Sequence, residues 1–250
     1  MKLPTILEKI LGWIVTLIVP VVLTLLAVRL VLNPWYVEFE YRTPNFPADE
    51  YGFTREDRLK YSKIDIEYLL NNADISFLGD LHFPEGQQAP AISCQFMEDC
   101  TKLYNERELG HMVDVKNVVQ GALKVLYSGA AILGLLGLWA WLGKWGRSYL
   151  QGLRSGGRLT VVLLGGIILF VLLAFGVIFV FFHEIFFASG TWTFYYSDTL
   201  IRLFPERFWR DTFLMVGGLA GVMGVALGWG LLSKNLKIKE IESEGTGDKG

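Results

Sequence analysis

Two of the chain's three histidines occupy positions suited to acid–base chemistry. His111 lies a few residues before an apolar run, and His183 directly follows another apolar run. Glu108 and Asp114 stand three residues before and three residues after His111, so on a helix the three side chains share a face. An unperturbed histidine has a pKa of about 6.5 and can take or give a proton near neutral pH. The two positions would allow acid–base chemistry.

Other interpretations of the two histidines stay open. Histidine is amphipathic and tolerated at a membrane interface, so two such residues on one side could be a coincidence. Two histidines and one or two carboxylates can also bind zinc, although a histidine pair with i,i+4 spacing is absent from the sequence. We expect no metal and no cofactor. His82 has no acidic neighbour closer than Asp80, and we expect it to be a surface or packing residue.

The elements that must position the histidines are membrane-spanning helices. Apolar residues make up 52% of the chain and charged residues only 19%, whereas soluble domains carry roughly 25% charged residues. Four apolar runs are long enough to cross a bilayer, which takes about 20 residues: Ile10–Leu32, Val118–Leu142, Leu159–Phe182 and Thr212–Leu232. The sequence therefore predicts an all-α polytopic membrane protein with four transmembrane helices and an extracytoplasmic, mostly helical or irregular cap. A net charge of −2 excludes a basic nucleic-acid-binding surface.

These runs divide the chain into eight segments. They are a first transmembrane helix (1–32), an extracytoplasmic cap (33–116), a second transmembrane helix (117–142), a basic cytoplasmic loop (143–158), a third transmembrane helix (159–182), an aromatic extracytoplasmic loop with an interfacial helix (183–211), a fourth transmembrane helix (212–232) and a cytoplasmic tail expected to be disordered (233–250). The fourth helix carries Gly217, Gly221, Gly224 and Gly228, which is typical of close helix packing in membranes.

The orientation follows from the distribution of basic residues. Cytoplasmic loops carry an excess of lysine and arginine, and the basic residues gather in the two termini and in one loop: Lys2, Lys9, Lys144, Arg147, Arg154, Arg158, Lys234, Lys237 and Lys239. Both termini are therefore expected in the cytoplasm. This orientation places both histidines at the outer boundary of the bilayer.

The predicted cap contains local structural signals. Thr54 followed by Asp57 predicts a helix start with Thr54 as the N-cap. Cys94 and Cys100 lie outside the membrane and close in sequence, so a local disulfide is plausible and a pair of free thiols is the alternative. Ser197 is expected to cap a short helix that lies flat on the membrane surface.

The segment after His183 is unusually aromatic. Its rings are Phe186, Phe187, Trp192, Phe194, Tyr195, Tyr196, Phe204, Phe208 and Trp209, and another group, Trp35, Tyr36, Phe39 and Tyr41, follows the first apolar run. An interfacial belt of tryptophan and tyrosine is one explanation. The density of rings also predicts a confined apolar chamber.

Two stretches resemble the signatures of the bacterial lipoprotein intramolecular transacylases. Residues 108–116 read Glu-Leu-Gly-His-Met-Val-Asp-Val-Lys, similar to the family's E-x-x-H-M-x-D-V-K pattern. The second signature is similar to residues 183–187, Gly190, Trp192, Phe194 and 198–209. Residues 74–100 carry no pattern of the family.

The resemblance implies an integral enzyme of the bacterial cytoplasmic membrane without cofactors, whose partners are its substrate and membrane lipid. The substrate is a diacylglyceryl lipoprotein, and the sn-2 acyl chain moves to the α-amino group of the lipoprotein's own N-terminal cysteine to give a lyso-form lipoprotein. His111 and His183 match the family's catalytic pair. The candidates for orienting the pair or binding substrate are Glu108, Asp114, Lys116, Trp192, Asp198 and Tyr36. The sequence predicts no oligomeric state.

Such a reaction needs no nucleophile from the enzyme, because the substrate's amine attacks the substrate's ester through a ring of about eight atoms. One histidine would act as base, and the other would support the oxyanion or protonate the leaving oxygen; which does which stays open. Two alternatives stay open as well. One is a lipid-ester hydrolase that uses the same histidines, and the other is a non-enzymatic membrane receptor or scaffold whose cap binds a partner.

Overall fold

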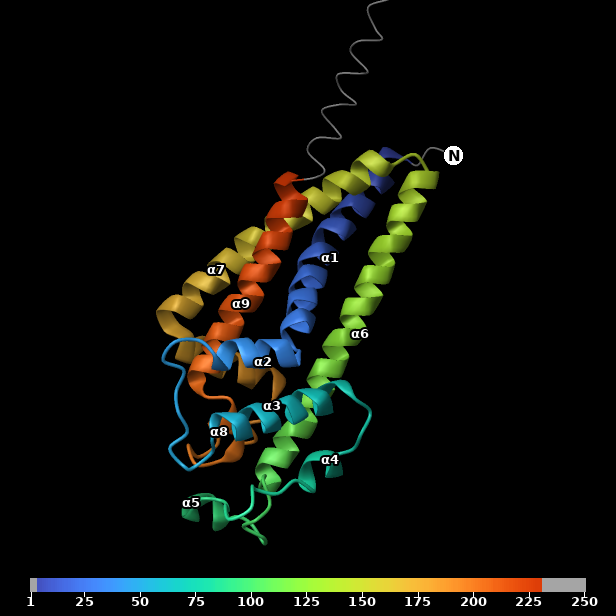
Figure 1. Ribbon diagram of the computed structural model, residues 1–250. Coiled ribbons are helices and arrows are strands. Elements are labelled where there is room, and N and C mark those ends of the chain that lie inside the picture. Colours follow the sequence, from blue (N-terminus) through green and yellow to red (C-terminus); the bar gives the residue numbers. More distant parts are fainter. Residues whose placement is uncertain (1–3, 231–250) are drawn as a thin grey trace, which may run out of the picture. The chain divides into compact units, whose positions relative to one another are not determined.

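The computed structural model describes residues 4–230 and is built from helices (Figure 1). In chain order the elements are α1 (Thr5–Val31), α2 (Pro34–Tyr41), α3 (Arg55–Leu70), α4 (Ser76–Gly79), α5 (Ala91–Cys94), α6 (Glu106–Leu142), α7 (Gly146–Phe186), α8 (Thr199–Leu203), α9 (Glu206–Val225) and a terminal π-helical turn (Ala226–Gly230). Within the described residues the only strand-like pairing is an isolated bridge between His82 and Lys102. The predicted all-α class is confirmed.

Four helices are long and apolar enough to cross a membrane, as predicted. They are α1 with 27 residues, α6 with 37, α7 with 41, and α9 continued through the π-helical turn with 25. Large apolar side chains on them are exposed in the isolated chain, for example Trp141 and Leu173, each 76% exposed. Such surfaces are expected where helices face lipid.

The helices extend beyond the apolar runs. The second predicted helix begins at residue 117, but α6 begins at Glu106, so His111 lies inside it. Residues 143–158 were expected to form a loop, yet α7 is helical from Gly146. Arginine and leucine are good helix formers and no proline interrupts this stretch, so the helix continues past the apolar boundary. The end of the predicted fourth helix at Leu232 and the predicted tail 233–250 lie outside the described residues, as does Lys2.

Helix starts in the cap follow local sequence. The Thr54 hydroxyl accepts a hydrogen bond from the Asp57 N–H, and the Asp57 carboxylate accepts one from the Thr54 N–H, so the predicted cap of α3 is confirmed. The expectation for Ser197 is wrong, because Asp198 holds the N-cap position of α8. The Ser197 hydroxyl instead accepts a hydrogen bond from Ser93 at 2.8 Å, which links this loop to the end of α5.

The described residues form two compact units. The first takes the chain up to Val28, Lys124–Leu169 and the described part from Met215 onward. Glycines permit close helix contacts in this unit. A Cβ on Gly224 would meet the Gly157 carbonyl oxygen at 2.8 Å, and one on Gly217 would meet Ile168 at 2.8 Å. A Cβ on Gly221 would meet nothing within 4 Å, so only part of the predicted glycine pattern serves close packing.

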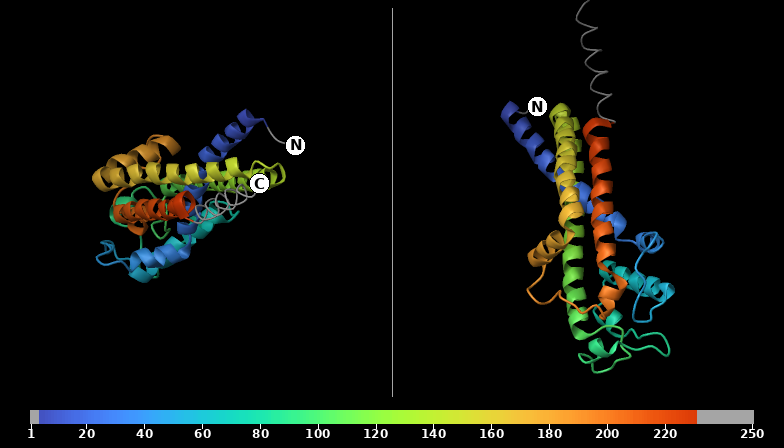
Figure 2. Two further views of the ribbon diagram at one scale, coloured as in Figure 1. Left: turned by 90° about the horizontal axis from the view of Figure 1, so that it is seen from above. Right: turned by 90° about the vertical axis from the view of Figure 1, so that its left-hand side faces the viewer.

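The second unit takes Arg29–Leu123 and Phe170–Leu214, and it contains both candidate histidines. Its core joins the cap segments to the start of α6 and to α8 through the buried side chains Phe53, Tyr61, Tyr68, Leu69, Leu78, Phe83, Ala89, Leu103, Tyr104, Met112, Leu200 and Leu203. Short helix α4 lies beside the first turns of α6 (Figures 1 and 2), where Leu109 approaches Gly79. Cys94 and Cys100 form a disulfide in this unit.

Candidate active site

The structure brings His111 and His183 together within the second unit. His111 lies near the start of α6 and His183 in the last turn of α7. Their ring centroids are 6.2 Å apart and their planes differ by 20°. Both side chains are buried, with 8% and 9% exposure. The two imidazoles therefore flank one small volume, which is the geometry that a two-histidine reaction needs.

Aromatic rings surround the pair. Phe187 and Phe194 meet the His111 ring at centroid distances of 4.8 and 5.2 Å. The His183 ring packs against Phe179 at 4.1 Å and Trp192 at 4.9 Å. These rings come from the end of α7 and from the loop that follows it, as the density of aromatic residues predicted. A polar reaction in such surroundings is shielded from water.

The two imidazoles differ in their hydrogen bonds. His183 Nδ1 lies 2.7 Å from the Phe179 carbonyl oxygen, which can only accept a hydrogen bond. Nδ1 therefore carries the proton, and in the neutral ring the lone pair is on Nε2. His111 Nδ1 is buried and has no hydrogen-bond partner within the described part of the chain. One ring has a fixed tautomer, and the other keeps an unpaired polar atom at the site.

Within the described residues, the acids near His111 do not form a hydrogen bond to its ring. Glu108 accepts hydrogen bonds from the Asn105 N–H at 3.0 Å and the Leu200 N–H at 2.7 Å. Asp198 accepts from Arg107 at 2.7 Å and from the Tyr195 N–H at 2.9 Å. Backbone N–H groups at helix starts take the carboxylate oxygens because they have no partner within the helix. These acids therefore fix the positions of the start of α6, α8 and the aromatic loop relative to one another.

The remaining candidates lie apart from the pair. Lys116 donates to Asn71 and Ala73 and sits over the Tyr68 ring at 3.9 Å. The Tyr36 hydroxyl accepts a hydrogen bond from Thr212 at 3.0 Å.

Asp114 is half-buried and makes no hydrogen bond or ion pair among residues 4–230. Of the six orienting or binding candidates, Trp192 packs its ring against a histidine, and none forms a hydrogen bond or ion pair with either histidine within the described residues.

Two buried acids in the cap were not anticipated as structural groups. Burial raises the pKa of Asp49, but hydrogen bonds from Arg202 and from the Phe53 N–H outweigh it and hold that pKa below its usual range. Burial raises the pKa of Asp65 to about 7, and the hydrogen bond from Tyr104 offsets this only in part. The first group is an anion at neutral pH, and the second titrates near it.

The start of α6 was not predicted, although the sequence indicates it. Asn105 accepts from the Glu108 N–H at 3.0 Å while Glu108 accepts from the Asn105 N–H, which is a reciprocal capping box. An asparagine three residues before a glutamate, ahead of a helical run, predicts such a start. The Asp49–Arg202 pair had no such signal, because its members are far apart in sequence.

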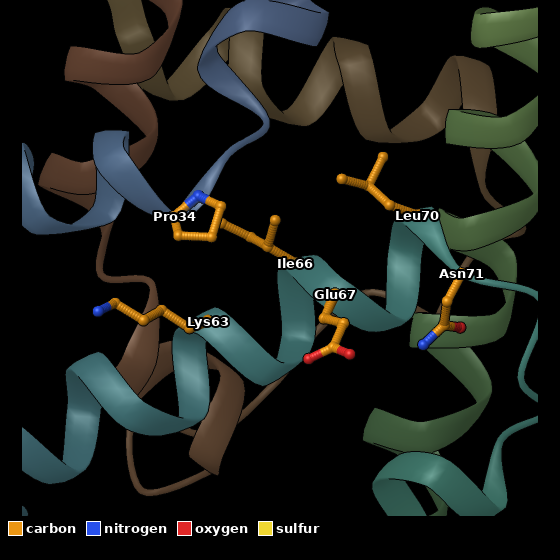
Figure 3. A pocket seen from close by; sticks show the side chains of 6 residues that line it. All are labelled: Pro34, Lys63, Ile66, Glu67, Leu70 and Asn71. Atoms are coloured by element: carbon orange, nitrogen blue, oxygen red, sulfur yellow. The ribbon is translucent and has the colours of Figure 1, made fainter.

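A separate pocket of about 380 Å³ lies between the start of α2 and one face of α3. It is lined by Pro34, Lys63, Ile66, Glu67, Leu70 and Asn71 (Figure 3). The histidines and the rings packed around them are not among its lining residues, so the pocket is separate from the candidate site.

Four spanning helices and a buried histidine pair in an aromatic enclosure define a class, an integral membrane protein with a candidate acid–base site. The family model of the lipoprotein intramolecular transacylase Lit matches residues 13–209. The chain belongs to this family. The predicted family, the membrane-integral fold and the assignment as an enzyme, a lipoprotein transacylase, are therefore confirmed.

Individual relatives and solved structures match most of the chain. An uncharacterised protein of Aquifex aeolicus (strain VF5) is 28% identical over 237 residues, which cover 91% of this chain and 96% of that protein. The membrane-integral lipoprotein intramolecular transacylase of Bacillus cereus has a similar fold, with a TM-score of 0.74 at 21% identity over 95% of this chain and 100% of that chain. A structure of the Bacillus cereus protein with a histidine-to-alanine substitution gives a TM-score of 0.69 at 20% identity over 94% of this chain and 96% of that chain.

Proposed function

We propose that the chain moves the sn-2 acyl chain of a diacylglyceryl lipoprotein to the α-amino group of that lipoprotein's own N-terminal cysteine, giving the lyso form. His111 and His183 are the acid–base pair in this proposal. The observation that carries it is the pair of buried imidazoles, 6.2 Å apart within an aromatic enclosure, in a chain of the transacylase family.

The reaction places a particular demand on the enzyme. The amine and the ester belong to one molecule, and the transition state closes a ring of about eight atoms, so alignment is the main difficulty; favourable orientation can contribute about 7–11 kcal/mol. A ring-lined enclosure restrains the glyceryl group. It also excludes the water that would otherwise hydrolyse the ester.

The two imidazoles have different roles in the reaction. The Phe179 carbonyl oxygen fixes the proton of His183 on Nδ1, so Nε2 is free to take the proton from the attacking amine. As the new C–N bond forms and the glyceryl C–O bond breaks, the same nitrogen returns this proton to the glyceryl oxygen. His111 supports the negative charge on the ester oxygen with its ring N–H. No enzyme-bound acyl group is formed.

The site faces the outer side of the bacterial cytoplasmic membrane, and both termini are cytoplasmic. Lys144, Arg147, Arg154 and Arg158, at the connection between α6 and α7, support this orientation through the positive-inside rule. Segments 33–116 and 183–211 then form the outer cap, over which the peptide of the lipoprotein leaves the membrane.

The test expresses the chain in a host that makes only diacyl lipoproteins and locates the acyl groups by tandem mass spectrometry. We expect an acyl chain on the cysteine amine with no change in total mass. His111→Asn and His183→Asn should abolish this transfer, and His82→Asn, in the third histidine, should not. Release of a fatty acid would indicate a hydrolase instead. Full transfer by both variants of the pair would refute the proposal.

A further inference from the structure

The site contains a second unpaired polar group besides His111 Nδ1. Trp192 Nε1 is buried and has no hydrogen-bond partner among the described residues. Its ring packs against His183 at a centroid distance of 4.9 Å with the planes tilted by 38°. An indole N–H can only donate, and buried donors nearly always have an acceptor. The Trp192 N–H is therefore a donor that no described protein group occupies, beside His183.

The indole N–H groups of two other tryptophans have different surroundings. The Trp35 indole donates to the Leu30 carbonyl oxygen at 2.9 Å. Trp145 Nε1 is also buried without a conventional partner, but its ring makes T-shaped contacts with Trp139 and Tyr149 at 81° and 83°. In T-shaped contacts an aromatic face can accept an N–H. The contact of Trp192 with His183 is closer to stacking, so the face of the His183 ring does not accept the Trp192 N–H in this way.

The chemistry of the proposed reaction supplies an acceptor for this N–H. When the amine adds to the ester, the carbonyl electron pair moves onto the oxygen, which becomes an oxyanion. This oxygen is bonded to the carbon under attack, so it must lie close to the base that takes the amine proton. The Trp192 ring is in contact with that base, His183. The unpaired donor and the developing charge therefore meet in one small region.

We propose that Trp192 Nε1–H donates a hydrogen bond to the carbonyl oxygen of the sn-2 ester and stabilises the oxyanion there, as a second donor beside His111. The inference rests on the proposed function. In the addition step the C–N bond forms, the amine proton passes to His183, and the oxyanion is held by two ring N–H groups. When the intermediate collapses, the carbonyl re-forms, the glyceryl C–O bond breaks and the proton moves to the glyceryl oxygen. Trp192 itself exchanges no proton.

Trp192→Phe tests this role, because phenylalanine keeps an aromatic ring while it removes the N–H donor, together with part of the ring area of indole. Loss of one oxyanion donor typically lowers kcat by about 10²–10³-fold, and we expect a fall of this size with KM within about threefold. Phenylalanine fills less space than indole, so the full-length protein in detergent should lose some thermal stability, and kcat is therefore compared well below the melting temperature. A purely structural role predicts that kcat of the folded protein stays near the wild-type value there.

Two further variants complete the test. Trp145→Phe removes an indole N–H of similar burial from the other unit, and its kcat should be unchanged. Trp192→His keeps a ring N–H at an equivalent position and should recover at least about tenfold of the kcat lost in Trp192→Phe.

Wild-type kcat in Trp192→Phe, a change in KM alone, or equal losses in the Phe and His variants would overturn the role of Trp192. If His111→Asn and His183→Asn still abolish transfer in that case, the proposed function stands without it.

Discussion

Replacing Asp49 by asparagine is expected to destabilise the cap strongly. Asp49 and Arg202 form a doubly hydrogen-bonded ion pair, at 2.9 and 3.0 Å, with side-chain exposures of 1% and 2%. The Asp49 carboxylate also accepts from the Tyr51 and Phe53 N–H groups. The pair joins the loop before α3 to α8, the helix that follows the aromatic loop of the candidate site.

The expected magnitude follows from the burial and the distance. Two unit charges 2.9 Å apart attract by roughly 6 kcal/mol at an effective dielectric constant of about 20. Asparagine keeps part of the hydrogen bonding but leaves Arg202 as an unpaired buried charge, and breaking such pairs costs about 3–5 kcal/mol. We expect a loss of this size.

The pH dependence has a definite sign. Burial raises the pKa of Asp49, but the hydrogen bonds from Arg202 and from the Phe53 N–H lower it by more. The folded-state pKa therefore lies below the unfolded value of about 3.9. The pair therefore stabilises the fold above about pH 4, and this contribution is lost as the pH falls through the lowered pKa. The difference between wild type and Asp49→Asn should shrink in acid.

The assay is thermal and denaturant unfolding of the protein in detergent, followed by tryptophan fluorescence. Arg42→Gln is the matched control, because Arg42 pairs with Glu38 at 3.9 Å and with side-chain exposures of 72% and 40%; such pairs contribute about 0–1 kcal/mol. Arg202→Met combined with Asp49→Asn should be more stable than Asp49→Asn alone. A free energy of unfolding for Asp49→Asn within about 1 kcal/mol of wild type would refute the reasoning.

Three further predictions concern other parts of the chain. Burial raises the pKa of Asp65 to about 7, so the free energy of unfolding falls by up to roughly 4 kcal/mol as the pH rises from about 4 to 7. The melting temperatures of Asp65→Asn at pH 5 and pH 8 should therefore differ less than those of wild type. Replacing both Cys94 and Cys100 by serine should cost about 2 kcal/mol of unfolding free energy, given the six-residue separation, and reductant should destabilise only the wild type. A Cβ on Gly156 would come within 2.5 Å of a side chain of α1, whereas one on Gly166 would meet nothing within 4 Å; Gly156→Ala should lower stability by about 1–3 kcal/mol and Gly166→Ala should not.

The convergence of His111 and His183 was predictable because it depends on topology. Each histidine stands at the end of an apolar run, and the positive-inside rule places both ends on one side. The number of long helices follows from bilayer thickness in the same way. Neither inference needs any side-chain contact, so both can be made without a structure.

The partners of the acids were not predictable, because tertiary packing decides them. Glu108 lies on the same helical face as His111, which favours an interaction between them, yet its oxygens bind the N–H groups of Asn105 and Leu200. Similarly, Ser197 and Asp198 are both good N-caps, and the hydrogen bond from Ser93 to Ser197 depends on a segment far away in sequence. Local propensity gives equivalent choices here, and the packing of α8 on α6 selects one.

The polar and apolar parts of the site have separate roles. Glu108 ties α6 to α8 at the Leu200 N–H, and Asp198 holds the Tyr195 N–H just before α8, so the loop that carries Trp192 and Phe194 is anchored at one end by buried carboxylates. Because these acids satisfy backbone donors, they are not free to act as bases near the ester. The histidines are then the basic groups left inside a ring-lined enclosure. That division suits an intramolecular transfer, in which the substrate supplies the nucleophile and the protein must supply alignment, one proton shuttle and donors for the oxyanion.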